Sequence, residues 1–480
     1  MERRGESMSN NEGKTEKEEL GDNLKGYRGY ARKKLEAAGA KIWDVVEVVK
    51  GKGVTRGIIL PRSEFEEDTR HVNLKLKSGY NVGIKLSDSV TINIYGYEVG
   101  EYGFPEKEIA IVEDLPTVAL IGTGGTIASR LNYRTGAVLP AFTPGELFTA
   151  VPELAEICNL KPEMAFNIVS EDMNPEKWVE LAKKIASKIN DEQVDGIVVA
   201  HGTDTMCFTG TALSFLLQNP PGPIILVGSQ RSSDRPSSDS ATNLINAVTC
   251  AANADLAEVL VCMMGTTDHK YDLLHRPALT RKMHSSRRDA FKTIGAIPFG
   301  RVQEGKTTVF ETSYRKRDKN RELVVDLKMN SKVALLYHYP GIQPEIIENL
   351  IDKKYNGIVI AGTGLGHISE NLLAPLKRAI EEKVAVVMTV QTLWGYTGMR
   401  VYERGREELA LGIIPGRNML PETAYVKLCW VLGHTHNLEE VAQQMQANIA
   451  GELINRETAQ GYLIFQGVEE QLEEQSKPPE

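Results

Sequence analysis

The sequence lacks the cysteine patterns that mark disulfide frameworks and zinc sites. Only five of its 480 residues are cysteine, an odd number, and no two of them form a C-x-x-C pair. This scatter excludes a disulfide framework and a zinc knuckle, so we interpret the five as reduced thiols of the core. They are Cys158, Cys207, Cys250, Cys262 and Cys429.

Long apolar runs are also missing. No stretch reaches the roughly eighteen residues that a membrane-spanning helix needs, and the opening residues Met1 to Ser7 do not contain the apolar core of a signal peptide. We therefore expect a soluble, cytoplasmic protein with no membrane partner.

Nucleotide and metal motifs are absent as well. A Rossmann fingerprint beginning at Gly122 and Gly124 would need a glycine where Ile127 stands, and no G-x-x-x-x-G-K-[S/T] motif occurs. The sequence also has no H-E-x-x-H motif and no cluster of cysteine and histidine. We predict that this chain binds no nucleotide, cofactor or metal itself, and that its histidines are structural.

The chain is acidic overall, with a net charge of −8. Such a balance argues against a protein that binds nucleic acid with its whole surface, although a local basic face is compatible with it. Residues 25–56 hold nine Lys or Arg against three Asp or Glu, and a second basic run covers residues 315–321. A solvated face is the simplest interpretation of both; contact of the first run with RNA or a partner is the alternative.

The hydrophobic pattern changes twice along the chain. Residues 1–22 have the composition of a disordered leader. Within residues 23–115, a helical stretch precedes five short segments of alternating hydrophobicity, which predicts a small β-barrel domain. The predicted helix covers residues 27–38, and the predicted strands cover residues 42–49, 54–60, 72–76, 80–86 and 90–95.

Beyond Pro116, apolar runs alternate with helical segments, which is typical of βαβ units and parallel sheets. We predict a large α/β domain over residues 116–310, with strands at 196–200, 224–227 and 259–263. A linker or hairpin over 311–331 leads to a smaller α/β domain over 332–467, and an acidic tail covers 468–480. The smaller domain should hold strands at 333–337, 357–360 and 384–390, with helices at 344–353 and 370–382.

Two loops rich in glycine and threonine each follow a predicted buried strand. The first ends at Thr126 and the second contains Thr203 and Asp204. Open α/β sheets place their ligand sites at the carboxyl ends of parallel strands. A threonine hydroxyl is a poor nucleophile until a base or a charged neighbour activates it, so a lysine is expected nearby, and Lys292 lies in a semi-apolar context. These residues suggest acyl transfer through a covalent intermediate.

The motifs G-T-G-G-T-I-A and H-G-T-D-T-M resemble those of the L-asparaginase and glutaminase family across residues 117–453. The resemblance implies that Thr126 is the nucleophile and that Thr203, Asp204 and Lys292 form the second catalytic set. It also implies that Tyr133 is a lid residue contacting the nucleophile. By the same resemblance, Ser170 and Asp204 bind substrate, while Glu171 replaces the glutamine that many free asparaginases have there.

A small β-barrel fused to an asparaginase-like body resembles the D subunits of archaeal glutamyl-tRNA(Gln) amidotransferases. The resemblance implies that the chain releases ammonia from glutamine for a partner E subunit, which would bind ATP, magnesium and most of the Glu-tRNA(Gln). It further implies a homodimer of this chain, joined by two E subunits into a heterotetramer. The asparaginase-like body should have two α/β domains with parallel sheets.

Two other functions are compatible with the sequence. A free cytosolic L-asparaginase with an extra N-terminal domain would hydrolyse asparagine without a partner. A non-catalytic scaffold is the other alternative, but a scaffold has no chemical need for two threonine hydroxyls, a carboxylate and a lysine together.

Overall fold

The computed structural model describes residues 23–62, 68–77, 81–97, 111–124, 129–131, 138–140, 151–231 and 237–462. The chain divides into two compact units, an N-terminal unit containing α1 and β1–β5, and a body containing the elements from β6 onward. The predicted leader 1–22, the predicted tail 468–480, Thr126 and Tyr133 lie outside the described residues.

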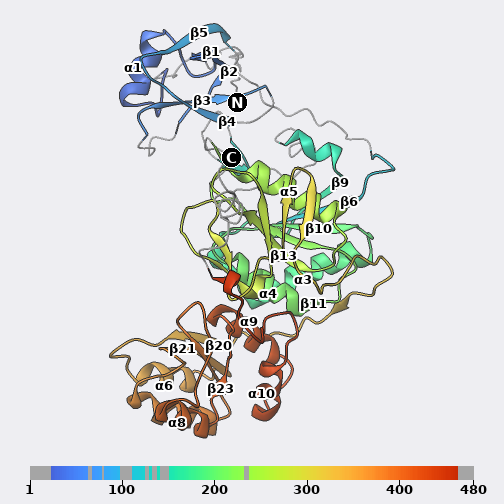
Figure 1. Ribbon diagram of the computed structural model, residues 1–480, viewed down its shortest axis with the longest axis vertical. Coiled ribbons are helices and arrows are strands. Elements are labelled where there is room, and N and C mark those ends of the chain that lie inside the picture. Colours follow the sequence, from blue (N-terminus) through green and yellow to red (C-terminus); the bar gives the residue numbers. More distant parts are fainter. Residues whose placement is uncertain are drawn as a thin grey trace, which may run out of the picture. The chain divides into compact units, whose positions relative to one another are not determined.

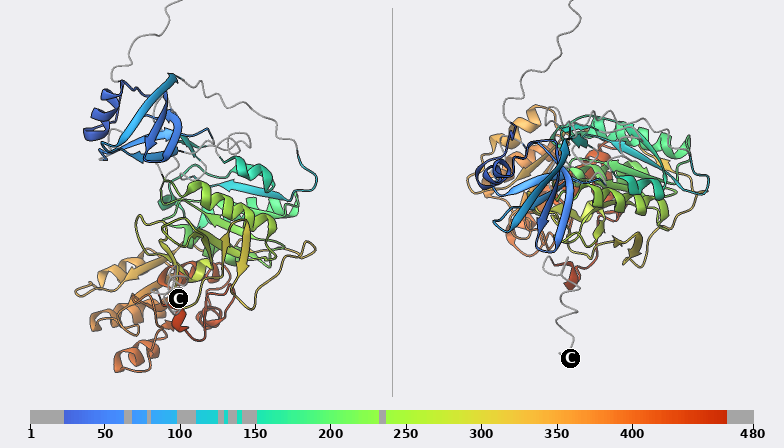
Figure 2. Two further views of the ribbon diagram at one scale, coloured as in Figure 1. Left: turned by 45° about the horizontal axis from the view of Figure 1, so that its top comes forward. Right: turned by 90° about the horizontal axis from the view of Figure 1, so that it is seen from above.

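The N-terminal unit is a five-stranded antiparallel sheet in the order β4-β3-β2-β1-β5, with one helix (Figures 1 and 2). Alternation places Val46, Val48, Val72 and Leu74 in its core, beside Leu35 of the helix. The predicted helix and five strands are confirmed within two residues at each end. Their bounds are α1 Gly29–Ala37, β1 Asp44–Lys50, β2 Gly53–Ile59, β3 His71–Lys75, β4 Asn81–Lys85 and β5 Val90–Tyr97.

The larger sheet of the body has eight strands in the order β18-β17-β14-β13-β12-β10-β6-β9. Strands β9, β6, β10, β12 and β13 run parallel, and β14, β17 and β18 continue the sheet antiparallel. Their bounds are β6 Thr117–Gly122, β9 Asn159–Met164, β10 Gly196–Ala200, β12 Ile224–Val227, β13 Val259–Met264, β14 Asp272–His275, β17 Gly300–Gln303 and β18 Lys306–Val309. The three strands predicted for this region are therefore confirmed.

Helices cover both faces of this sheet, because successive strand residues point to opposite sides. Ile197 and Val199 pack with α3 (Pro175–Asn190) and α4 (Met206–Leu216). Val198 and Ala200 pack with α5 (Ser240–Asn253) on the other face (Figure 1). Two-stranded ribbons complete the region: β7 (Ser129–Leu131) with β8 (Val138–Pro140), β11 (Leu217–Gln218) with β19 (Val324–Val325), and β15 (Thr280–Lys282) with β16 (Phe291–Thr293).

The C-terminal region of the body contains a second parallel sheet in the order β20-β21-β22-β23. Here too the predicted strands and helices are confirmed. Their bounds are β20 Val333–Tyr337, α6 Glu345–Asp352, β21 Gly357–Gly362, α7 Leu373–Glu381, β22 Ala385–Val390, α8 Glu403–Leu411, β23 Ile414–Pro415, α9 Pro421–Val431 and α10 Leu438–Gln446.

One helix joins the two parallel sheets. Residues of α9 share a core with α4 of the larger sheet and with Val359 and Val387 of the smaller one. The hydroxyl of Thr423 on α9 also donates a hydrogen bond to the backbone oxygen of Ala278, 2.7 Å away. The C-terminal region is therefore anchored next to the ribbon β15–β16, and this anchoring bears on the site below. No helix among the described residues is long and apolar enough to cross a membrane.

Candidate active site

The site lies at the carboxyl ends of β6 and β10, which pair in parallel with Gly122 beside Ala200. Thr123 donates two hydrogen bonds to the backbone oxygen of Ala200, from its amide at 3.0 Å and from its hydroxyl at 3.1 Å. Gly124 follows with φ of +113°, and a Cβ there would lie 2.1 Å from the oxygen of Ile168, so only glycine fits. The loop that leads to Thr126 is thus fixed where it leaves the sheet.

The second loop, after β10, is held by buried contacts. His201 is 2% exposed, and its Nδ1 lies 2.7 Å from the backbone oxygen of Gly202. Burial lowers the pKa of His201 to about 4. His201 is therefore neutral at physiological pH and supports the loop as a packing residue, which agrees with the structural role predicted for the histidines.

Ser170, a residue expected to bind substrate, lies against this loop. A Cβ on Gly202 would lie 2.7 Å from Cβ of Ser170, and the Thr205 hydroxyl donates to the Ser170 backbone oxygen at 2.6 Å. The Ser170 hydroxyl donates to Oε2 of the exposed Glu171 at 3.2 Å. Ser170 therefore packs against the loop that carries Thr203 and Asp204, and Glu171 lies beside Ser170.

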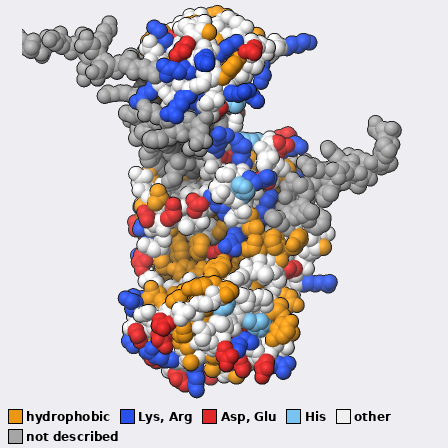
Figure 3. Space-filling view, turned by 90° about the vertical axis from the view of Figure 1, so that its left-hand side faces the viewer, with side chains coloured by type: hydrophobic (Ala, Val, Ile, Leu, Met, Phe, Trp, Pro, Cys, Tyr) orange, Lys and Arg blue, Asp and Glu red, His pale blue; other side chains and the backbone are white. Residues whose placement is uncertain are grey.

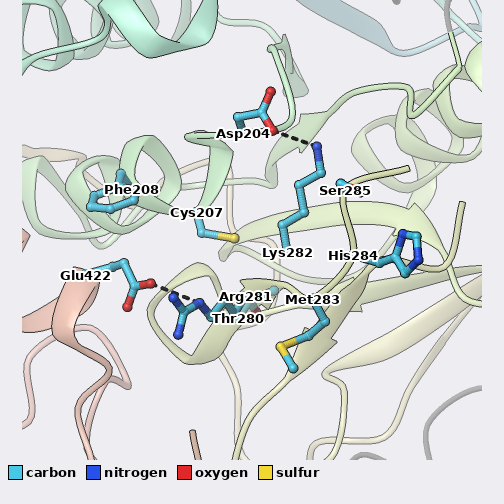
Figure 4. A pocket seen from close by; sticks show the side chains of 10 residues that line it. All are labelled: Asp204, Cys207, Phe208, Thr280, Arg281, Lys282, Met283, His284, Ser285 and Glu422. Atoms are coloured by element: carbon cyan, nitrogen blue, oxygen red, sulfur yellow. Dashed lines mark hydrogen bonds and ion pairs between the residues drawn. The ribbon is translucent and has the colours of Figure 1, made fainter. Parts of the chain in front are cut away.

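Thr203 and Asp204 meet a lysine that the sequence prediction missed. The ammonium of Lys282 on β15 donates to Oγ1 of Thr203 at 2.9 Å and to Oδ1 of Asp204 at 2.8 Å. The Lys282 side chain is 13% exposed, whereas that of Asp204 is 60% exposed. In Figure 4, Lys282 extends from its strand toward Asp204. The Lys282 ammonium therefore connects the Thr203 hydroxyl and the Asp204 carboxylate at the carboxyl end of β10.

Lys292, the lysine predicted for this position, lies on the partner strand of the same ribbon. It pairs directly with Arg281, and Phe291 pairs with Lys282. Directly paired residues share a face and neighbours alternate, so Lys292 projects from the face opposite to Lys282. Its ammonium lies 3.7 Å from Oδ2 of Asp289. The prediction is corrected accordingly: the lysine at Thr203 and Asp204 is Lys282.

The apolar neighbours that suggested Lys292 have another cause. Phe291 is fully buried in the core shared by α4 and α9, so this segment is apolar because it packs the interior. No sequence signal singles out Lys282. It lies 79 residues after Thr203, and only the pairing of two three-residue strands brings it to the site.

The site opens into a cavity of about 340 Å³ lined by both regions of the body. Arg281, next to Lys282, places Nε 3.1 Å from Oε1 of Glu422 at the start of α9. It also places Nη2 3.4 Å from the hydroxyl of Tyr337 on β20. Figure 4 shows Arg281 directed toward Glu422 and away from Lys282. The strand that carries Lys282 is therefore tied to the C-terminal region by the preceding residue.

Within the described part of the chain, no group of three or more His, Cys, Asp or Glu residues is placed to hold a metal ion. The polar groups at the strand ends are instead hydroxyls, a carboxylate and an ammonium. This set is suited to acyl transfer, in which a hydroxyl attacks a carbonyl carbon and charged neighbours move protons. Together with the two parallel sheets, it defines an amidohydrolase of the asparaginase class.

Family models match the chain in three segments. Residues 117–315 match the asparaginase N-terminal domain, residues 332–445 match the glutaminase/asparaginase C-terminal domain, and residues 40–94 match the GatD N-terminal domain. The solved L-asparaginase of Thermococcus kodakarensis is similar with a TM-score of 0.62 and 31% identity. That similarity covers 99% of the asparaginase but 71% of this chain.

Relatives that match nearly the whole chain are D subunits of glutamyl-tRNA(Gln) amidotransferases. The D subunit of the glutamyl-tRNA(Gln) amidotransferase of Pyrococcus furiosus is 49% identical over 426 residues, covering 87% of this chain and 96% of the relative. The corresponding D subunit of Methanobrevibacter smithii is 46% identical, covering 91% of this chain and 99% of the relative. The chain belongs to the family of glutamyl-tRNA(Gln) amidotransferase D subunits.

Proposed function

We propose that this chain hydrolyses the side-chain amide of glutamine and supplies the ammonia to a partner subunit that converts Glu-tRNA(Gln) to Gln-tRNA(Gln). The observation that carries the proposal is the contact of Lys282 with both Thr203 and Asp204 at the carboxyl end of β10. The names of the relatives support the tRNA-dependent reaction.

In the proposed reaction, the Thr126 hydroxyl attacks the amide carbon of glutamine. Its proton goes to the departing nitrogen, the C–N bond breaks, ammonia leaves, and a glutamyl ester remains on Thr126. Water then attacks the ester carbon, the C–O bond to Thr126 breaks, and glutamate is released with the hydroxyl restored. Thr203 and Lys282 relay protons near the reacting atoms, while Tyr133 closes over the nucleophile.

The proposed orientation of glutamine follows the family resemblance for Ser170 and the charges of Asp204 and Glu171. We assign the α-carboxylate of glutamine to the Ser170 side of the site and its α-ammonium to Asp204. Glu171 carries a negative charge beside Ser170, so it favours the ammonium and repels the carboxylate. We therefore propose that Glu171 and Asp204 share the α-ammonium, and that substrate binding moves Glu171 away from the Ser170 hydroxyl.

The partners belong to the same proposal. The chain forms a homodimer, and two E subunits join it in a heterotetramer that binds Glu-tRNA(Gln) mainly through the E subunits. The E subunit binds ATP and magnesium, and this chain binds no cofactor. Light scattering of the chain alone and of its mixture with the E subunit measures both assemblies; a monomer, or a complex with one E subunit per two chains, would contradict this arrangement.

Ammonia release tests the function directly. The purified chain is assayed with glutamine and with asparagine, alone and then with the E subunit, ATP and Glu-tRNA(Gln). We expect glutamine hydrolysis that rises in the complete system and disappears in Thr126→Val and Thr203→Val variants. Vigorous asparagine hydrolysis by the chain alone, unaffected by the E subunit and tRNA, would instead make it a free asparaginase.

A further inference from the structure

The N-terminal unit differs from the rest of the chain in charge. Residues 23–97 contain fourteen Lys or Arg and eight Asp or Glu, whereas the remainder contains forty-two and fifty-six. Figure 3 shows many Lys and Arg side chains on the visible face of this unit. Such an asymmetry between parts of one chain is typical of proteins in which one part meets a polyanion.

The cations at one end of the sheet are not neutralised by the protein. Lys50 ends β1, Lys52 lies in the turn to β2, and both are exposed and without an ion pair among the described residues. In the body, by contrast, Lys184 and Lys188 both reach Glu163, at 3.0 and 2.7 Å. The charges of Lys50 and Lys52 are therefore available to a ligand.

An exposed aromatic side chain lies beside this hairpin, on the neighbouring strand β5. Val54 and Arg56 point to the outer face of β2, and the guanidinium of Arg56 lies over the ring of Tyr95 on β5, 5.0 Å from its centre. The Tyr95 hydroxyl donates to Oε1 of Glu47 at 3.3 Å, which fixes the ring, yet Tyr95 is 56% exposed. We call Lys50, Lys52, Arg56 and Tyr95 the hairpin strip.

We propose that the hairpin strip binds RNA, and that its ligand is an unpaired segment of the tRNA. An unpaired base stacks against Tyr95 and Arg56, while the two lysines contact neighbouring phosphates. Aromatic rings and guanidinium planes on a sheet are a common platform for unpaired bases, and basic side chains beside them follow the backbone. An acidic protein surface would use the three cations but would gain nothing specific from the exposed ring.

The choice of tRNA as the RNA rests on the function proposed above, whereas RNA binding by the strip does not. The combined Lys50→Glu, Lys52→Glu and Arg56→Glu substitutions test the charges in the full chain. Fluorescence anisotropy measures the binding of a labelled single-stranded oligoribonucleotide and of tRNA over a series of salt concentrations. We expect at least a tenfold loss of affinity and a salt slope smaller by about 1.4, because the phosphate contacts of the two lysines disappear.

Tyr95→Ala separates stacking from charge. We expect about a tenfold loss of RNA affinity with an unchanged salt slope, because the base loses its platform while the phosphates keep their cations. The control combines Lys306→Glu, Lys328→Glu and Lys353→Glu, three lysines of the body, and should change affinity less than twofold. Thermal unfolding checks that each variant is folded, and Lys→Gln and Arg→Gln versions replace any that is not.

Two readouts keep this proposal distinct from the proposed function. The charge-reversal variant should release ammonia from glutamine like the wild type, and Thr203→Val should bind RNA like the wild type. Unchanged RNA affinity and slope in the charge-reversal variant, or no RNA binding by the wild type, overturns the hairpin strip as an RNA site. Loss of ammonia release in Thr203→Val alone leaves the strip intact and supports the catalytic assignment.

Discussion

The large α/β region and the C-terminal region each contain a lysine whose ammonium touches a carboxylate. Lys282 lies 2.8 Å from Asp204, and Lys427 on α9 lies 2.6 Å from Glu452. The distances are similar, but the surroundings differ. Both side chains of the second pair are fully buried, whereas Asp204 is 60% exposed.

The hydrogen bonds around the two lysines also differ. Lys427 donates to the backbone oxygens of Met445 and Ala447 as well as to Glu452, so all three of its protons are used. Burial lowers the pKa of Lys427 below its usual value. Lys282 has two acceptors among the described residues, Thr203 and Asp204. A fully buried ammonium with three acceptors is therefore structural, whereas a partly exposed one with two acceptors keeps a proton for chemistry.

Lys282→Met should produce the largest effect. We expect glutamine hydrolysis to fall by about 10²–10⁴-fold, because proton transfer at the site loses its cation. The unfolding midpoint should change little, since this side chain is partly exposed and packs at the edge of a cavity. Ammonia release and urea unfolding measure the two properties. Normal activity would remove Lys282 from the mechanism, and a parallel Lys292→Met variant tests the lysine that the sequence pattern favoured.

Lys427→Met should produce the reverse pattern. We expect the free energy of unfolding to fall by about 3–5 kcal/mol, because Glu452 is left buried without its cation. The folded fraction should keep its kcat/KM for glutamine. Denaturant unfolding with activity measured at low temperature checks both. The double variant Lys427→Met with Glu452→Gln is the matched control, and it should recover part of the lost stability; no recovery would show that packing, not charge, dominates.

Glu408 is a buried carboxylate that contacts no lysine among the described residues. It is fully buried on α8, accepts a hydrogen bond from the Ile368 amide at 3.1 Å, and lies 3.8 Å from Nδ1 of His367. Burial raises the pKa of Glu408 to about 7. Its contribution to stability is therefore fully present below the unfolded pKa of about 4.5 and is lost as pH rises through 7.

Glu408→Gln should remove this pH-dependent loss of stability, because the amide does not ionise. Its side-chain oxygen can still accept the hydrogen bond from the Ile368 amide. Relative to the wild type, we expect the variant to gain about 3 kcal/mol of stability between pH 4.5 and 8. Urea unfolding at a series of pH values measures the difference, and Glu348→Gln, an exposed position on α6, is the control. A difference that stays constant with pH would mean that Glu408 is charged throughout.

Glu422→Gln tests the connection between the two regions and should have the smallest effect. The substitution weakens the contact of Glu422 with Arg281, which holds the strand of Lys282 against α9. Small displacements of a catalytic group reduce rates, and we expect about a tenfold lower kcat/KM for glutamine. Glu439→Gln, on α10, is the control. An unchanged rate would show that β15 keeps its position without the C-terminal region.

Much of the fold could be predicted from hydrophobic periodicity. Fully apolar runs such as residues 196–200 and 357–362 mark strands buried on both faces, and alternating runs in residues 42–95 mark strands buried on one face. The Thr203–Asp204 loop was found because it directly follows such a strand. Ser170 was placed by family resemblance, and the structure brings it to the same loop.

The lysine could not be predicted in the same way. Lys282 and Lys292 lie in one ribbon, on two paired strands that are close along the chain. Which of them faces Thr203 depends on strand pairing, because a side chain's face is set by its register. Likewise, nothing local to Lys427 indicates that Glu452 will be sealed beside it, since their contact depends on how α9 and the segment after α10 pack.

The sequence by itself determined the order of strands and helices, the two threonine loops and the basic N-terminal unit, because each depends on residues close along the chain. Only the tertiary structure decided that Lys282 meets Thr203 and Asp204, that Lys427 is sealed, and that Arg56 covers Tyr95. These contacts join residues from separate elements. Their geometry follows from register and packing, which patterns of neighbouring residues do not encode.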